Sequence, residues 1–419
     1  MNDLDETRVR ATCHIGFSSP VESVRPPGMT SSDATGAREP QHGPVQHYGA
    51  LALAVQGDWG RFLADSAQTH SHARCLSGPH HYSIAARPAV KPQAACPPAL
   101  RCVLQDTRAA GVDSDLPPSD TCHPRTRRQD GQPPSDTALH PRPWCRDLSP
   151  LPHDARVVFN TLSAGECAQL RSCADSLGYS FWHPDAGDNE LRFRNADTVE
   201  VTCPELAHGL WLRLRPYVTP SVRLSAESCE RGTQGDWLAV GVNPVLLFSR
   251  YTHGGHFSPH TDGNTVVDFN HRSLYSVIVY LNTCEDGTGG TTLFVPPTGV
   301  GNTPPAGAFI CDEAQRLRWP AEWAVGTAPA QEGAVLMFHQ DVPHEGVPVG
   351  PGSAKYIIRT DIMYQRTPPL CDDPSGRAAY SLVQQAAAAE ADGDANAAAK
   401  MYRLASRECP TLAHMVGIA

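Results

Sequence analysis

The sequence predicts a mainly β fold with flanking helices, in which short strands form a sandwich or jelly roll. Three observations lead to this class. From Trp237 onward, short runs rich in β-branched and aromatic residues follow one another, with Gly, Pro, Asn and Asp between them. No helical pattern separates these runs, which argues against a parallel α/β sheet. Two helical segments precede the runs, and an Ala-rich helix pair follows them.

The individual elements follow from local patterns. Ser163 and Glu166 form a capping box, so a helix begins there, and Gly178 ends it. A second capping box is predicted at Thr202–Glu205, with its helix ending at Pro216. The predicted strands are 156–159, 245–248, 274–281, 291–295, 334–338 and 356–363.

Residues 1–148 carry no sustained helical or strand period and are rich in Pro, His, Ser and Ala. The stretch 117–125 is nearly repeated at 133–142, which is typical of Pro-rich disordered or extended sequence. We therefore expect a disordered region at 1–148, in which the four histidines at 70, 72, 80 and 81 are solvated. A catalytic domain is expected at 149–367.

The C-terminal residues 374–419 are predicted to form a helical hairpin. Ala378–Ala391 and Ala395–Arg407 are the two helices, and Pro410 ends the second. The pair looks like a single tetratricopeptide-type unit. One unit forms no solenoid, so we expect it to pack on the β domain or to cover its end.

Composition excludes several classes of protein. The net charge is −10 and no Lys/Arg block is long enough to form a nucleic-acid binding patch, so a nucleic-acid partner is not expected. No run of about 18 apolar residues predicts a membrane span, and Met1–Arg10 has no apolar signal core. The 14 cysteines include no CxxC pair. We therefore expect reduced thiols in an intracellular, cytoplasmic protein, without a zinc site or a disulfide scaffold.

Three residues can build an open iron site. His260 and Asp262 are two positions apart, so on a strand both side chains reach the same side. His344 supplies a second imidazole much later in the chain. Two His and one carboxylate suit non-haem Fe(II) chemistry, because they leave coordination positions open. An alternative set, His339, Asp341 and His344, would come from one loop and is less favoured.

A cation on the last predicted strand completes the constellation. Lys355, Arg359 and Asp361 share one face of that strand. Buried cations are costly unless they are paired. Asp361 can pair with Arg359, which leaves Lys355 for a ligand carboxylate. The reverse assignment stays open, with Arg359 as the second choice.

The order of these motifs resembles the catalytic domain of 2-oxoglutarate/Fe(II) dioxygenases of the prolyl 4-hydroxylase type. The resemblance covers Val158–Tyr364, about half of the chain. The pieces that carry it are Leu162–Cys167, Arg250-Tyr251, His260-x-Asp262, Tyr280-Leu281-Asn282, Gly289–Phe294, His344-Glu345-Gly346 and Lys355-Tyr356.

The resemblance implies a double-stranded β-helix core and a set of site residues. Fe(II) would be held by His260, Asp262 and His344. Lys355 would form a salt bridge with the distal carboxylate of 2-oxoglutarate, helped by Tyr251 and Thr292. Tyr280 either lines the same pocket or packs in the core.

The resemblance also implies a reaction. The enzyme would use O2 and 2-oxoglutarate to hydroxylate an unactivated C–H bond, giving succinate and CO2, with ascorbate as reductant. The expected substrate is a prolyl or other residue of a protein. Alternatives are a free amino acid or small molecule as substrate, a β-barrel that binds a partner without turnover, and nucleic-acid demethylation, which the acidic charge disfavours.

One segment departs from the family pattern. The gap between Asp262 and His344 is long, and Asn302–Trp323 looks like an inserted surface loop. A plain insertion is the simpler interpretation, and part of a lid or a substrate-facing wall is the alternative. No motif in the sequence decodes the substrate.

Overall fold

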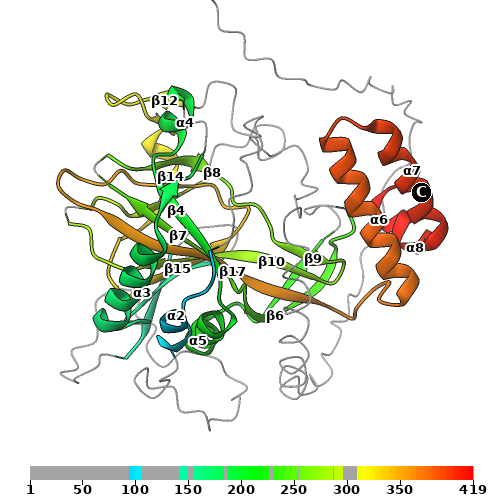
Figure 1. Cartoon of the computed structure of the whole chain (residues 1–419), viewed down its shortest axis with the longest axis horizontal. Coiled ribbons are helices and arrows are strands. Elements are labelled where there is room, and N and C mark those ends of the chain that lie inside the picture. The colour runs from blue at the N-terminus through cyan, green and yellow to red at the C-terminus, as the bar shows by residue number, and fades with distance from the viewer. Residues whose placement is uncertain are drawn as a thin grey trace, which may run out of the picture. The chain divides into compact units, whose positions relative to one another are not determined.

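The computed structural model describes residues 94–104, 142–148, 154–183, 187–225, 231–252, 254–285, 287–295 and 309–418 (Figure 1). All of them belong to one unit of the chain, Tyr48–Ala419. The four histidines at 70–81 and nearly all of the Pro-rich repeat lie outside the described residues. Within the described ranges, no helix is long and apolar enough to cross a membrane.

Two antiparallel sheets form the centre of the domain, which confirms the predicted jelly-roll core. The larger sheet has 11 strands, with the central order β1-β2-β15-β10-β17-β7-β4-β3 and with β5, β6 and β9 attached. The smaller sheet has the order β14-β11-β16-β8. The larger sheet consists of β1 (Trp144–Asp147), β2 (Ala155–Phe159), β3 (Ser180–Phe181), β4 (Asp197–Thr202), β5 (Ser221–Leu224), β6 (Gly235–Val242), β7 (Val245–Tyr251), β9 (Val266–Asp268), β10 (His271–Tyr280), β15 (Val335–His339) and β17 (Lys355–Thr367). The smaller consists of β8 (Phe257–His260), β11 (Thr291–Phe294), β14 (Ala324–Ala328) and β16 (His344–Gly346).

Successive side chains of the central strands point to opposite faces of the sheet, and the two faces contribute to two different hydrophobic clusters. On β10, Val277 and Val279 belong to the cluster shared with the helices, whereas Ile278 and Tyr280 belong to the cluster shared with the smaller sheet. That second cluster includes Leu293 of β11. One face of β10 therefore packs on helices, and the other faces the smaller sheet.

Helices α3 (Ala164–Leu177) and α5 (Pro204–Leu214) contribute Leu170, Leu206 and Leu210 to the first cluster. The capping box at Ser163 and Glu166 is confirmed, since each group accepts a backbone N–H of the other residue. The second predicted box is wrong. Thr202 is the last residue of β4 and pairs with Val245, so Cys203 is the N-cap and provides no side-chain cap.

The expected boundary of the ordered domain is also corrected. Helix α2 (Pro98–Cys102) buries Leu100, and Leu104 packs so close to α5 that a Cβ on Gly209 would lie 2.6 Å from the Cβ of Leu104. Ala94 forms a bridge with Val201 of β4, and β1 pairs with β2. Residues 94–104 and 142–148 therefore contribute to the domain, because their apolar side chains complete its core.

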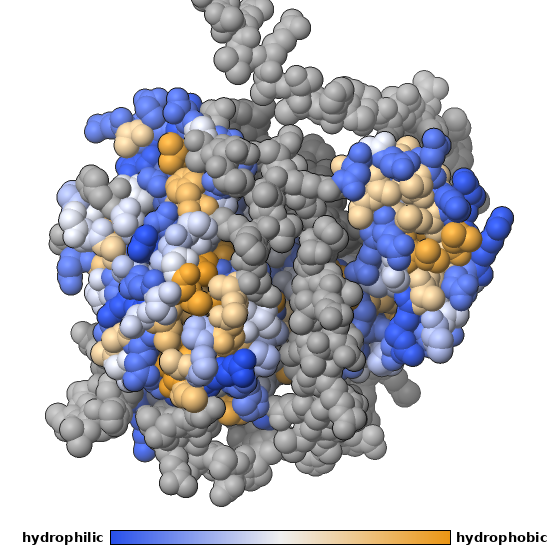
Figure 2. Space-filling view, viewed as in Figure 1, coloured by the Kyte–Doolittle hydropathy of each residue, from blue (hydrophilic) through white to orange (hydrophobic). Residues whose placement is uncertain are grey.

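Three helices, rather than two, follow β17. Helices α6 (Pro374–Ala391) and α7 (Ala395–Glu408) occupy the predicted positions, but Pro410 begins a further helix, α8 (Pro410–Val416). Their apolar cluster includes Phe269 of the β9–β10 turn, whose ring lies 5.3 Å from that of Tyr380. The side of these helices that Figure 2 shows mixes hydrophobic and hydrophilic residues.

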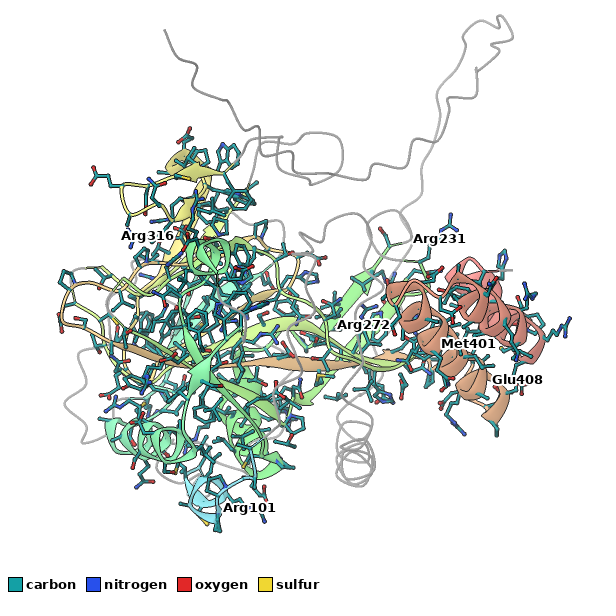
Figure 3. The ribbon with its side chains drawn as sticks, turned by 45° about the horizontal axis from the view of Figure 1, so that its top comes forward. Arg101, Arg231, Arg272, Arg316, Met401 and Glu408 are labelled. Atoms are coloured by element: carbon teal, nitrogen blue, oxygen red, sulfur yellow. The ribbon has the colours of Figure 1, made fainter. Side chains whose placement is uncertain are left out.

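The inserted segment is more than a plain surface loop. Its described part, 309–323, forms the hairpin of β12 (Ile310–Cys311) and β13 (Leu317–Arg318), followed by a 3₁₀ turn, Ala321–Trp323. Trp319 is buried in a separate aromatic cluster with Phe294, Phe309 and Trp323. The hairpin is found at the β12 label in Figure 1 and at Arg316 in Figure 3.

Candidate metal centre

Two neighbouring strands of the smaller sheet bring the three candidate ligands together. His260 ends β8, His344 begins β16, and the two are cross-strand partners. Their ring centroids are 4.2 Å apart. Asp262 follows on the loop after β8. Ligand atoms of His260, Asp262 and His344 all lie within 4.8 Å of one another, the one such group of His, Cys, Asp or Glu in the described parts of the chain.

Hydrogen bonds orient both imidazoles toward the centre. The Nδ1 of His260 lies 2.7 Å from the carbonyl of Ser258, and the Nδ1 of His344 lies 3.1 Å from that of Val342. Since Nδ1 donates to a carbonyl, Nε2 keeps a free lone pair. Each Nε2 lies 3.7 Å from an oxygen of Asp262. Burial lowers the pKa of His344 to about 3, which keeps this imidazole neutral.

Two further polar side chains contact Oδ2 of Asp262. Ser276 donates a hydrogen bond of 2.5 Å to Oδ2, and Nη2 of Arg359 lies 3.6 Å from the same oxygen. Burial raises the pKa of Asp262, but the Arg359 charge and the adjacent imidazoles outweigh it and hold this pKa well below its usual range. An ionised carboxylate beside two imidazoles fits the donor set of an Fe(II) site.

The alternative ligand set does not assemble. His339 ends β15 and pairs with Tyr275 of β10 in the larger sheet. The Asp341 side chain is 70% exposed and lies 3.7 Å from Nδ1 of His339. Neither residue joins the group formed by His260, Asp262 and His344.

Lys355 is a buried cation near β16: a Cβ on Gly346, two residues after His344, would lie 3.4 Å from its Nζ. It begins β17, opposite Tyr251 of β7, and its Nζ lies 4.2 Å from the centre of the Tyr251 ring. The residue is 2% exposed, and no carboxylate of the described residues forms an ion pair with it. Burial, with the charge of Arg194 adding to it, lowers the pKa of Lys355 to about 8. A buried ammonium in this state is suited to an anionic ligand.

Arg359, unlike Lys355, has carboxylates within ion-pair range. Its Nη2 lies 3.0 Å from Oδ1 of Asp361 and 3.6 Å from Oδ2 of Asp262. The pairing of Arg359 with Asp361 is the one expected from their shared face, and of these two cations of β17 it leaves Lys355 without a carboxylate partner among the described residues.

Strand register separates two adjacent threonines on β11. Thr292 lies opposite Glu345 and Leu293 lies opposite His344, so Thr292 is on the face directed away from the two imidazoles. Thr291 is on the inner face, where its Oγ1 accepts a 2.8 Å hydrogen bond from the buried Tyr280. Burial raises the pKa of Tyr280, so its hydroxyl stays a donor. The structure thus groups Thr291, rather than the predicted Thr292, with Tyr280.

Sequence reasoning missed an aromatic wall beside His260. Phe257 stacks on the His260 ring with centroids 3.6 Å apart, and Phe193 at the end of α4 (Asp188–Phe193) contacts both rings. The Arg194 guanidinium lies 4.5 Å from the Phe257 ring centre. The three-residue spacing of Phe257 and His260 gave no signal, because strand positions three apart normally point to opposite faces, and nothing local indicated Phe193 or Arg194.

An antiparallel jelly roll that brings two His and one Asp to one point has the donor set of a non-haem iron site. Residues 246–360 match the family model of the 2OG-Fe(II) oxygenase superfamily, a range that includes the His/Asp/His group and Lys355. This part of the chain is thus a 2OG-Fe(II) oxygenase domain, and the protein is a 2-oxoglutarate-dependent dioxygenase. Enzymes of this family use Fe(II), 2-oxoglutarate and O2.

Solved structures with a similar fold include two prolyl hydroxylases. The viral collagen prolyl hydroxylase of Paramecium Bursaria Chlorella virus-1 is 17% identical, with a TM-score of 0.28, over 50% of this chain and 96% of that one. The Pseudomonas putida prolyl-4-hydroxylase is 16% identical, with a TM-score of 0.30, over 51% and 94% of the two chains. Likenesses this distant do not establish a substrate. No curated protein matches the sequence.

Proposed function

We propose that the protein hydroxylates an unactivated C–H bond, with Fe(II) held by His260, Asp262 and His344. The convergence of these three side chains beside a buried lysine without a carboxylate partner carries the proposal. Bound Fe(II), together with 2-oxoglutarate and O2, supplies the oxidising power, and succinate and CO2 are the by-products. Ascorbate is proposed as the reductant that keeps the iron in its active state.

The side chains of this pocket divide the work between orientation and charge. The carbonyls of Ser258 and Val342 fix the two imidazoles. Lys355 is proposed to bind the distal carboxylate of 2-oxoglutarate, a contact worth about 1.5–3 kcal/mol. Tyr251 lies under its ammonium, and Tyr280 orients the Thr291 hydroxyl on the same inner face. Thr291 therefore replaces Thr292 in the proposed cofactor pocket.

A prolyl or other residue of a protein is the proposed substrate. The support is the ordered set of prolyl 4-hydroxylase-like motifs between Val158 and Tyr364, which a chain with only a binding role would not need. The aromatic wall of Phe193 and Phe257 beside His260 offers apolar surface next to the metal position.

Succinate formation from 2-oxoglutarate tests the proposal. The purified full chain is incubated with Fe(II), ascorbate and 2-oxoglutarate, first alone and then with Pro-rich peptides or free proline. Asp262→Asn is compared with Asp341→Asn, since each Asp is the third residue of an HxD sequence. We expect succinate from wild type and Asp341→Asn and none from Asp262→Asn. Equal activity of the two variants would contradict the assigned site, and stimulation by free proline rather than peptides would contradict a protein substrate.

A further inference from the structure

The buried carboxylate of Asp361 is a centre of hydrogen bonding next to the metal site. The side chain of Asp361 is 0% exposed. Oδ2 accepts from Asn243 at 3.1 Å and Thr265 at 2.9 Å, and Oδ1 accepts from Gln340 at 2.9 Å and pairs with Arg359 at 3.0 Å. A buried carboxylate needs such donors, because its charge is otherwise costly.

The donors come from segments that also hold the loop of Asp262. Thr265 lies on that loop, three residues after Asp262. Gln340 accepts the backbone N–H of Asp262 at 3.3 Å through its carbonyl, and its side chain donates to the Gly263 carbonyl at 3.3 Å. Ser273 accepts the Thr265 N–H and donates to the Gln340 side chain. Asp361 thus anchors the backbone that presents the metal-binding carboxylate.

Asp361 also sets the position of a competing cation. Arg359 has two carboxylates within ion-pair range in the described residues, Asp361 at 3.0 Å and Asp262 at 3.6 Å. Since Asp361 takes the closer contact, the guanidinium stays beside Asp262 without closing on it. An Arg359 released from Asp361 would pair with Asp262 and compete with a metal ion for the same oxygens.

We propose that Asp361 is the positioning residue of the metal centre: it anchors the loop that carries Asp262 and keeps Arg359 from neutralising that carboxylate. The proposal rests on the proposed function, because it takes His260, Asp262 and His344 as the metal ligands. The positioning role of Asp361 differs from that of the three ligands, which would bind the metal, and from that of Lys355, which would bind 2-oxoglutarate. Hydrogen-bond partners of metal ligands commonly change metal affinity about 10–100-fold.

Titration of the full chain with Mn(II), followed by electron paramagnetic resonance of the free ion, tests this role without turnover. Asp361→Asn keeps the shape of the side chain. It replaces one carboxylate oxygen by an NH2 group, which cannot accept hydrogen bonds from the donors around it. We expect its Mn(II) Kd to rise about 10–100-fold. Glu166→Gln is the matched control, because Glu166 is also a largely buried carboxylate bound by an arginine, Arg213 at 2.7 Å, but it lies on α3. Its Kd should stay at the wild-type value.

A second variant separates this role from a structural one. In Asp361→Asn/Arg359→Met the competing cation is removed, so Mn(II) affinity should recover at least about threefold relative to Asp361→Asn. If Asp361 served only the stability of the fold, the second substitution would give no such recovery. No recovery would therefore contradict the role assigned to Arg359.

Three further results of the Mn(II) titrations would overturn the inference about Asp361 or the proposed function. A folded Asp361→Asn, judged by its thermal unfolding, with a Kd within about twofold of wild type would overturn the inference. If that variant does not fold, Thr265→Val decides, since it removes one donor to Asp361 at constant volume. An unchanged Kd in Thr265→Val would then overturn the inference. If His260→Ala binds Mn(II) as wild type does, the proposed function fails, and this inference fails with it.

Discussion

Arg318 holds the buried carboxylate of Glu345 with two hydrogen bonds, from Nε at 2.7 Å and from Nη2 at 2.5 Å. Glu345 directly follows His344 and projects to the opposite face of β16. Arg318 belongs to β13 of the inserted hairpin. The ion pair therefore fastens the insertion to the strand that begins with a candidate metal ligand.

Loss of this ion pair should destabilise the protein. Arg318→Met leaves Glu345, whose side chain is 4% exposed, without its charged partner, so we expect the free energy of unfolding to fall by about 3 kcal/mol. Urea denaturation measures the change. Arg223→Met is the matched control, because Arg223 binds Asp236 with the same two-bond geometry at the surface. Water already competes for that exposed pair, so a loss as large as that of Arg318→Met would contradict the explanation.

The two threonines of β11 should respond differently to the same change. Thr291→Val removes the acceptor of the buried Tyr280 hydroxyl and should cost about 1–3 kcal/mol of stability. It should also weaken 2-oxoglutarate binding, whereas Thr292→Val on the outer face should alter neither quantity. Urea denaturation and 2-oxoglutarate titration by calorimetry measure the two effects. A stronger effect of Thr292→Val would show that the register assigned to β11 is wrong.

Lys355 should determine the affinity for 2-oxoglutarate. Its replacement by Met removes the charge proposed to bind the distal carboxylate, and the Kd should rise about 10–100-fold. The measurement is calorimetric titration in the presence of Mn(II). Lys400→Met on α7 removes an exposed lysine far along the chain and serves as the control. Equal Kd values for Lys355→Met and the wild type would instead direct attention to Arg359.

The same lysine predicts a pH dependence. Burial lowers the pKa of Lys355 from 10.5 to about 8, so the folded protein binds fewer protons than the unfolded chain between these values. The cost of burying this charge is therefore greatest below pH 8 and declines as the pH rises toward 10.5. Affinity changes in the opposite sense, because only the ammonium pairs with a carboxylate.

We expect the 2-oxoglutarate Kd to rise about fivefold between pH 8 and pH 9, in proportion to the loss of protonated Lys355. Lys355→Arg stays charged across this range and should give a flat profile, whatever its absolute affinity. Titrations at half-unit pH intervals provide the test. Parallel profiles for the wild type and Lys355→Arg would exclude Lys355 as the titrating group.

The sequence by itself determined the features that depend on neighbouring positions. The capping box at Ser163 needs only three residues of spacing. His260 and Asp262 lie close together because they are two residues apart, although Asp262 is on the loop after β8 and not on the strand that the sequence predicted. Lys355, Arg359 and Asp361 share a face of β17 because they are separated by even numbers of residues on one strand. The motifs then indicated the oxygenase domain, because they occur along the chain in the same order as in the family that the sequence resembles.

Tertiary structure decided the features that depend on distant partners. Whether Thr291 or Thr292 faces the centre follows from the pairing of β11 with β16, and a shift of one residue would exchange the two. Arg318 meets Glu345, and Leu104 reaches Gly209 of α5, only after the chain has folded. The network around Asp361 joins four segments in the same way. Such contacts leave no periodic pattern in the sequence, because each depends on how strands pair and pack across long separations.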